Sequence, residues 1–557
     1  MRRLFLMVLL LAFVAVAGWA CTTIIVTKGA SADGSVMTSH SADCGSCDFR
    51  LVYVPAADHE PGSKRAVYPF IEEFPRYVGK DMGPNYDIPG YPPTEPLGYI
   101  DQVEHTYAYF DAVYGVMNEH QLAIGECTTA AKVYARPKPG ECIFDVAALS
   151  RVAMERCKTA REAIQLMGDL AVKYGYYGWG ETLTVVDKEE AWVFEICASP
   201  DKKSALWVAK KVPDGEVFVE ANEFRIREVD PNDPDMMYSP NLFKVTAEAG
   251  WYDPSSGEPL DWLKTVSPGE YSKPYYSLRR VWRVLSRVAP SLNLPAYVEG
   301  PYTKAYPFSV KPEKKLTVAD VIDLFRDHYE GTEFDLTKGL AAGPFGNPNR
   351  YSGSSKLVKG SWERAISIFR CQYVFVSQTR GWLPDPVGGV VWWGAAAPHE
   401  TVLVPFYCGI TDIPDCYETG SLESFDRNIN YWAFNFMGNW AELKWSYMYP
   451  EIQELQKKIE GRLFAMQPAI ESAAVQLYDI NPELCKEFLT NYCADTADRV
   501  RQEVWDFNDY LITKYSDGYV NIPEVGHSVG YPDWWLKAVG YDKGHIFGPE
   551  GYKKPEE

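Results

Sequence analysis

Segments with strand character follow one another in blocks in this sequence, and segments with helical character do the same. Apolar and β-branched residues fill three consecutive segments at 181–187, 191–198 and 205–212, whereas helical spacing covers most of 449–515. A parallel sheet would need strands and helices to alternate along the chain. The grouping therefore predicts an α+β protein with antiparallel sheets and a helical C-terminal region.

Other segments complete this pattern. Hairpins are expected around the turn residues Asp33-Gly34 and around residues 118–120. Further helices are expected over 144–175, 277–288 and 316–329. Residues 55–100 have the composition of long loops, and residues 340–440 that of mixed loop and strand.

The N-terminus has the pattern of a secretory signal peptide. Arg2 and Arg3 precede an apolar run over residues 4–17, and Gly18 and Ala20 place small residues before a cleavage position. The run is short for a membrane span, and no second candidate span follows. We expect residues 1–20 to be removed and the protein to be exported, periplasmic or extracellular, without stable membrane insertion.

Cleavage after Ala20 would place Cys21 at the start of the mature chain, directly before a predicted strand at 22–26. Three interpretations are open: a lipid anchor, a disulfide or packed thiol, and a catalytic residue. Gly18 and Trp19 fit a lipid-attachment motif poorly. In the catalytic interpretation one residue supplies a thiol nucleophile and a free α-amine, whose pKa of about 7.7–8.0 suits a general base near neutral pH.

Charge and motifs exclude several classes of function. The net charge of −20 argues against nucleic-acid binding, which needs a basic surface. No phosphate-binding loop, dinucleotide fingerprint or zinc-peptidase motif occurs, so no cofactor and no metal are expected. Cys44 and Cys47 lack a second metal-spaced pair, which favours a disulfide or buried thiols there.

Several segments resemble the secreted dipeptidase A family of N-terminal-nucleophile (Ntn) cysteine peptidases, which are related to penicillin V acylase and bile salt hydrolase. The resemblance begins with CTTIIVTKGASADGSV at Cys21. It continues in family order, over roughly residues 21–515, with GVMNEHQLAIGECTT, TLTVVDKEEAWVFEI, WVAKKVPDGEVFVEANEFRI, RRVWR and FNFMGNWAELKWSYM.

The resemblance implies an Ntn-hydrolase αββα sandwich, with two antiparallel sheets between helix layers. This fold agrees with the grouping of strands and helices described above. We expect a signal peptide at 1–20, a catalytic domain with loop insertions at 21–440, and a helical C-terminal extension packed on it at 441–557.

The resemblance also implies a catalytic set. Cys21 matches the nucleophile, Asn222 the side-chain donor of the oxyanion hole, and the backbone N–H near Cys127 its second donor, with little role for the side chain there. Asp43 matches the carboxylate that holds the α-amine. Arg280 matches an arginine beside the nucleophile, although Arg279 fits equally well by count.

One position departs from the family pattern. His40 stands where many members have an arginine, so it could keep a positive charge or a hydrogen bond there, and the charge balance of the site is in question. Glu126 and Glu181 lie in matching segments, and we expect one of these carboxylates to bind the ammonium group of a dipeptide.

The function implied is that of an exported cysteine dipeptidase that forms an acyl-enzyme on Cys21. Two alternatives remain: an Ntn acylase that cleaves a non-peptide amide, and a lipid-anchored binding protein with acylated Cys21. The expected partner is a dipeptide or a small amide substrate, and homo-oligomerisation stays open.

Overall fold

The computed structural model describes residues 21–353 and 357–544, and its core consists of two antiparallel sheets. The first sheet has seven strands, in the order β18 (Ser309–Val310), β14 (Val217–Glu220), β1 (Thr23–Val26), β2 (Val36–Ser41), β19 (Tyr373–Thr379), β20 (Val390–Ala395) and β21 (Val404–Tyr407). The second has eight, in the order β16 (Met236–Tyr238), β13 (Ala205–Lys211), β12 (Ala191–Ala198), β11 (Gly180–Val186), β10 (Ala123–Thr129), β9 (Gly115–Asn118), β8 (Tyr109–Asp111) and β3 (Val52–Val54).

The two sheets face each other, with β1 and β2 lying against β10 and β11. Hydroxyl groups connect them, since Thr184 Oγ1 lies 2.9 Å from Thr23 Oγ1 and 2.6 Å from Thr38 Oγ1. Gly125 lies at this contact, and a Cβ atom added to it would come 2.5 Å from the carbonyl oxygen of Ser39. Glycine therefore permits the close approach of the sheets beside the start of β1.

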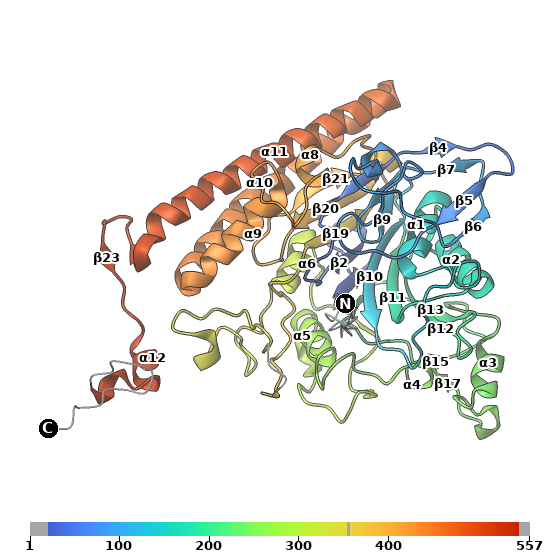
Figure 1. Cartoon of the computed structure of the whole chain (residues 1–557), viewed down its shortest axis with the longest axis horizontal. Helices are drawn as coiled ribbons and strands as arrows, with labels where there is room; N and C mark the ends of the chain where they lie inside the picture. Colours follow the sequence, from blue (N-terminus) through green and yellow to red (C-terminus); the bar gives the residue numbers. More distant parts are fainter. Residues whose placement is uncertain (1–20, 354–356, 545–557) are drawn as a thin grey trace, which may run out of the picture.

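Helices cover both outer faces of this pair (Figure 1). Helices α1 (Val146–Arg156) and α2 (Ala160–Tyr174) pack on the second sheet, and α5 (Leu278–Val288) and α6 (Val318–Phe325) contact the first. The predicted αββα sandwich is confirmed.

Three further helices form the C-terminal region: α9 (Asn430–Ala441), α10 (Trp445–Ile480) and α11 (Pro482–Tyr515). The two long helices lie side by side, and α11 runs along β21 at the edge of the first sheet (Figure 1). Asn481 caps α11 through its side chain, as the predicted break at this position requires. Within 21–353 and 357–544, no helix is both long enough and apolar enough to cross a membrane.

Smaller elements join these layers. Two-stranded ribbons pair β4 (Ala57–Asp58) with β7 (His105–Thr106), β5 (Lys64–Val67) with β6 (Gly98–Asp101), β15 (Glu228–Val229) with β17 (Leu260–Asp261), and β22 (Tyr519–Val520) with β23 (His527–Ser528). Short helices are α3 (Leu242–Glu248), α4 (Trp262–Val266), α7 (Asp385–Gly388), α8 (Asp415–Glu418) and α12 (Asp533–Ala538).

Three predicted boundaries were wrong. The helix expected over 144–175 is split, because Thr159 and Glu162 form a capping box that starts α2. The helix expected over 316–329 ends at 325, and Tyr329 has a positive φ of 68° that no right-handed helix accommodates. The loops expected over 55–100 contain short strands.

Cys44 and Cys47 form a disulfide, and the other ten cysteines are buried free thiols. The other cysteines that lie close together in the sequence are therefore not bridged, namely Cys127 and Cys142, Cys408 and Cys416, and Cys485 and Cys493. The predicted signal peptide lies outside the described residues.

Candidate active site

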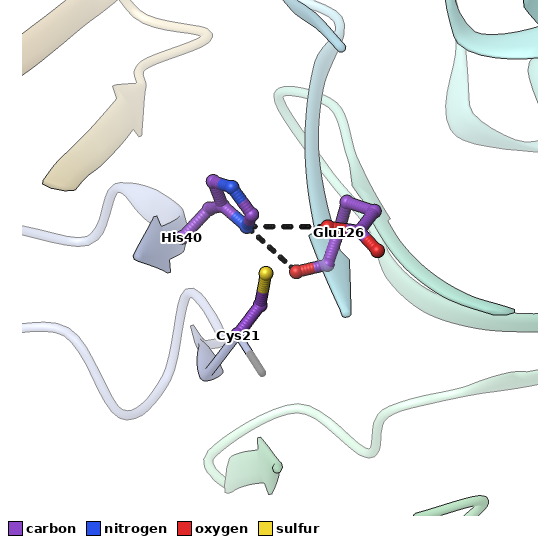
Figure 2. Close-up of side chains that lie close together, drawn as sticks. All are labelled: Cys21, His40 and Glu126. Atoms are coloured by element: carbon purple, nitrogen blue, oxygen red, sulfur yellow. Dashed lines mark hydrogen bonds and ion pairs between the residues drawn. The ribbon is translucent and has the colours of Figure 1, made fainter. Parts of the chain in front are cut away.

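Cys21 lies directly before β1, in the layer between the two sheets. The backbone N–H of Thr22 donates to Ser41 Oγ at 3.2 Å, and the N–H of Ser41 donates to the carbonyl of Thr22 at 3.1 Å. The β1–β2 hairpin thus holds Cys21 beside the end of β2. The thiol is buried and points between the side chains of His40 and Glu126 (Figure 2).

The surroundings of this thiol favour its protonated form. Burial raises the pKa of Cys21 well above its usual value, and the charges of Glu126 and Asp43 raise it further. The main chain of Asp43 acts in the opposite direction, and the sulfur lies within 4.8 Å of a carboxylate oxygen of Glu126. The thiol is therefore neutral near pH 7 and needs a base before it can attack.

His40, on β2, keeps a hydrogen bond but no charge. Its Nδ1 lies 2.6 Å from the main-chain oxygen of Glu126 and 3.8 Å from Glu126 Oε2. Burial lowers the pKa of His40 to about 4, so the imidazole is neutral at pH 7 and donates from Nδ1. His40 therefore does not carry the positive charge that an arginine would have at this position.

Glu126 and Glu181 form a buried pair of carboxyl groups on the adjacent strands β10 and β11. Burial raises the pKa of both carboxyl groups, and the charge of Glu126 raises that of Glu181 further. Glu181 is therefore the partner that holds a proton more readily. Thr128 Oγ1 donates to Glu126 Oε1 at 3.0 Å.

A cavity of about 200 Å³ opens beside this pair. Glu181 lines it together with aromatic side chains, among them Phe70, Tyr114, Tyr176 and Trp179. An apolar side chain next to an ammonium group would fit such a space, since the walls are aromatic and one end is acidic.

Arg280, on α5, contacts the main chain of Cys21 rather than its thiol. Nη1 donates to the carbonyl oxygen of Cys21 at 2.7 Å, and Nη2 donates to Asn222 Oδ1 at 2.6 Å. Arg279 lies elsewhere, with its guanidinium 3.5 Å from the ring centre of Phe334. The structure thus separates two arginines that the sequence could not, and brings Arg280 to the nucleophile.

Asn222 follows β14 with a positive φ of 67°. Its Nδ2 donates to the carbonyl of Thr128 at 2.6 Å. An amide nitrogen carries two N–H groups, so a second remains for another acceptor.

The side chain of Cys127 makes contacts that we did not expect. Its Sγ donates to the carbonyl oxygen of Cys21 at 3.0 Å and accepts from the backbone N–H of Asn222 at 3.2 Å. The resemblance implies little catalytic role for this side chain; its hydrogen bonds connect the two segments that carry Cys21 and Asn222.

Asp43 is fully buried and paired on one side. Its Oδ2 lies 2.5 Å from Arg364 Nη2, whereas Oδ1 has no hydrogen-bond partner within the described residues. Arg370 donates to the main-chain oxygen of Asp43. Both arginines lie more than 320 positions along the chain from Asp43, and no motif around them signals their role.

Two groups of side chains have the spacing of metal ligands within the described chain: Cys21, His40 and Glu126, and Cys44, Cys47 and Glu72. In the second group both sulfurs are consumed by the disulfide. A thiolate, an imidazole and a carboxylate are ligands that Zn²⁺ accepts, so the first group could hold such an ion at the cost of the thiol.

An αββα sandwich with a cysteine at the start of a central strand defines the class of the Ntn hydrolases. The model of peptidase family C69 matches residues 20–458, and the chain belongs to this family. It is therefore a hydrolase of peptide bonds.

Curated relatives carry names of the same kind. The chain is 28% identical to a probable dipeptidase of Salmonella dublin over 70% of this chain and 81% of the relative. It is 27% identical to a probable dipeptidase of Latilactobacillus sakei over 87% of this chain and 95% of the relative. A solved structure of penicillin V acylase from Agrobacterium tumefaciens aligns with 70% of this chain and 86% of that chain, at 10% identity and a TM-score of 0.27.

Proposed function

We propose that this chain is an exported cysteine dipeptidase whose nucleophile is the thiol of Cys21. Removal of residues 1–20 would free the α-amine of Cys21 and thereby activate the enzyme. One observation carries the proposal: the thiol is buried just before β1, within 4.8 Å of a carboxylate oxygen of Glu126 and of a ring nitrogen of His40.

The α-amine is the general base in this proposal. The raised pKa of the thiol means that a neighbouring group must accept its proton, and a neutral amine on the same residue can do so. Asp43 Oδ1, which has no partner in the described chain, is free to accept a hydrogen bond from that amine and orient it.

The reaction then proceeds in two steps. Sulfur attacks the carbonyl carbon, the second N–H of Asn222 and the backbone near Cys127 stabilise the developing oxyanion, and the amine returns the proton to the leaving nitrogen. Water next attacks the acyl-enzyme with the same amine as base, releasing the acid and regenerating the thiol.

Substrate recognition begins at the acidic pair. The Glu126 carboxylate lies within 4.8 Å of the thiol, so it is next to the position of the scissile carbonyl, where the α-ammonium of the first residue would bind. The names of the curated relatives support a dipeptide as the substrate.

We also propose the division into a catalytic domain at 21–440 and a helical extension at 441–557.

Mass spectrometry of the mature N-terminus tests activation. A free Cys21 is expected; a lipid on the sulfur would support the binding-protein alternative, and a cut at another position would overturn the mechanism.

Turnover of free dipeptides tests the chemistry. Cys21→Ala should abolish hydrolysis and Cys21→Ser should leave little, whereas Cys157→Ala, another buried free thiol, should retain activity. Unchanged turnover in Cys21→Ala would refute the mechanism, and cleavage of N-acyl amides alone would favour the acylase.

A further inference from the structure

Arg370 is a cation near the nucleophile for which the described chain provides no carboxylate within ion-pair distance. It is half-buried, one nitrogen donates to the carbonyl of Asp43, and Nη2 lies 3.4 Å from the hydroxyl of Tyr276. Arg364, by contrast, is paired with Asp43, and Arg279 lies 3.6 Å from Glu363. A half-buried guanidinium without an anion, in a chain of net charge −20, indicates a binding site for an anion from outside.

The surroundings of Arg370 are strongly positive. Burial opposes ionisation of the Tyr276 phenol, yet Arg364, Arg280 and Arg370 outweigh burial and lower its pKa. The hydroxyl of Tyr276 can therefore donate a strong hydrogen bond to a bound anion. This positive field and the unpaired guanidinium together favour a carboxylate as ligand.

Two sets of contacts place Arg370 in the neighbourhood of Cys21. The bridge between Thr22 and Ser41 brings Asp43, two residues after Ser41, to the Cys21 region, and the carbonyl of Asp43 accepts from Arg370. The ring of Tyr276 lies 5.1 Å from the guanidinium of Arg280, which donates to the carbonyl oxygen of Cys21.

The acidic pair contacts the same thiol through Glu126. Tyr271 connects the two regions: its ring lies 5.9 Å from that of Tyr276, and Glu181 and Cys21 are among the groups that raise its pKa. A substrate across this site would meet a carboxylate pair near one end and a guanidinium near the other.

A dipeptide has this distribution of charge. Its ammonium and carboxylate lie on the two Cα atoms that flank the scissile bond, so each charged end falls one residue or less from the attacked carbonyl. In a longer peptide, a neutral amide replaces the carboxylate at this position and the charge pairing is lost.

We propose that Arg370, assisted by Tyr276, binds the free α-carboxylate of the second substrate residue and thereby limits hydrolysis to dipeptides. This inference rests on the proposed dipeptidase function. It assigns the guanidinium a role in binding substrate and none in the proton transfers.

The test compares a dipeptide with its C-terminal amide, which has the same scissile bond without the carboxylate charge. A hydrogen-bonded charge pair contributes about 1.5–3 kcal/mol, so the wild type should prefer the free acid about 10- to 150-fold in kcat/KM. Arg370→Gln should lose most of this preference through a higher KM for the acid, with the amide nearly unaffected. Arg370→Lys should keep part of it.

Arg427→Gln is the matched control, because the Arg427 side chain is 58% exposed and its nearest carboxylate, on Asp509, is 4.0 Å away. It should leave the preference unchanged. An equal loss for acid and amide in Arg370→Gln would indicate a structural role and overturn the proposal.

Binding to the Cys21→Ala protein separates this inference from the proposed function. Calorimetry should show tighter binding of the dipeptide than of its amide, and Arg370→Gln in that background should abolish the difference. Equal affinities with Arg370 present would overturn the carboxylate site. Preference for the acid without turnover in the wild type would overturn the dipeptidase mechanism and leave the carboxylate site standing.

Discussion

The ion pair between Asp43 and Arg364 makes a quantitative test of how the site is built. The two side chains are 0% and 3% exposed, and their oxygen and nitrogen lie 2.5 Å apart. Removing one member of a buried pair leaves an uncompensated charge and costs about 3–5 kcal/mol. For Asp43→Asn the loss of unfolding free energy should be about 3 kcal/mol, because Arg364 still donates to the carbonyl of Ala365. For Arg364→Met the loss should be about 5 kcal/mol.

The double variant separates stability from catalysis. With both charges removed, the loss of unfolding free energy should be smaller than the sum of the single losses, by about 2 kcal/mol or more. Urea unfolding of the four proteins measures this coupling. Dipeptide hydrolysis should be abolished in Asp43→Asn and in the double variant alike, because under the proposed mechanism the α-amine of Cys21 loses the carboxylate that orients it.

An exposed pair provides the control. Arg427 and Asp509 are 58% and 64% exposed, so the same substitutions there should couple by less than about 0.5 kcal/mol. Additive losses at Asp43 and Arg364 would refute the buried ion pair. Recovery of activity in the double variant would show that Asp43 acts only through folding.

Three more substitutions test the site at other points. Gly125→Ala should destabilise the protein by about 1–3 kcal/mol in urea unfolding, because the added Cβ would lie within 3 Å of three oxygen atoms; an unchanged midpoint would contradict the close sheet contact. Burial raises the pKa of Glu195 to about 7, so the folded state holds its proton more tightly and the unfolding free energy should fall as the pH rises from about 4.5 to 7. In Glu195→Gln the unfolding free energy should fall by about 3 kcal/mol less over this pH range than in the wild type. An equal fall in the two proteins would contradict the raised pKa of Glu195. His40→Arg should pair with Glu126 and raise KM about tenfold for dipeptides with a free amine, whereas His40→Asn should not; equal KM values in the two variants would contradict the ammonium site.

The parts of the fold that could be predicted from the sequence are those set by local contacts. Strands β11, β12 and β13 are consecutive in the sequence and pair in that order. Their apolar and β-branched residues and the turns between them were therefore sufficient to predict these strands. Cys21, His40 and Asp43 come from one hairpin and its exit. The signal-peptide pattern indicated Cys21, and the family resemblance of the same short segment indicated His40 and Asp43. The split between α1 and α2 was also signalled, by a capping box placed inside the helix that we predicted.

The missing part of the site depends on a long-range strand pairing. Strand β19 pairs with β2 in a register that places Val374 opposite Ser41, and this brings the segment before β19 to the Cys21 region. Arg364 and Arg370 come from that segment. No local periodicity encodes a register between strands more than 300 residues apart, because it is set by packing of the whole sheet.

The neutral His40 explains how opposite charges can persist on the two sides of one thiol. An arginine at position 40 would bring a positive charge close to Glu126, the carboxylate proposed to bind the substrate ammonium. The imidazole instead donates to the main-chain oxygen of Glu126 and leaves its carboxylate to the thiol and to Glu181. The positive charges come from the other direction, through Arg364 and Arg370 on Asp43. In the proposed binding mode a zwitterionic substrate binds in one orientation only, since reversing it would place both of its charges next to like charges.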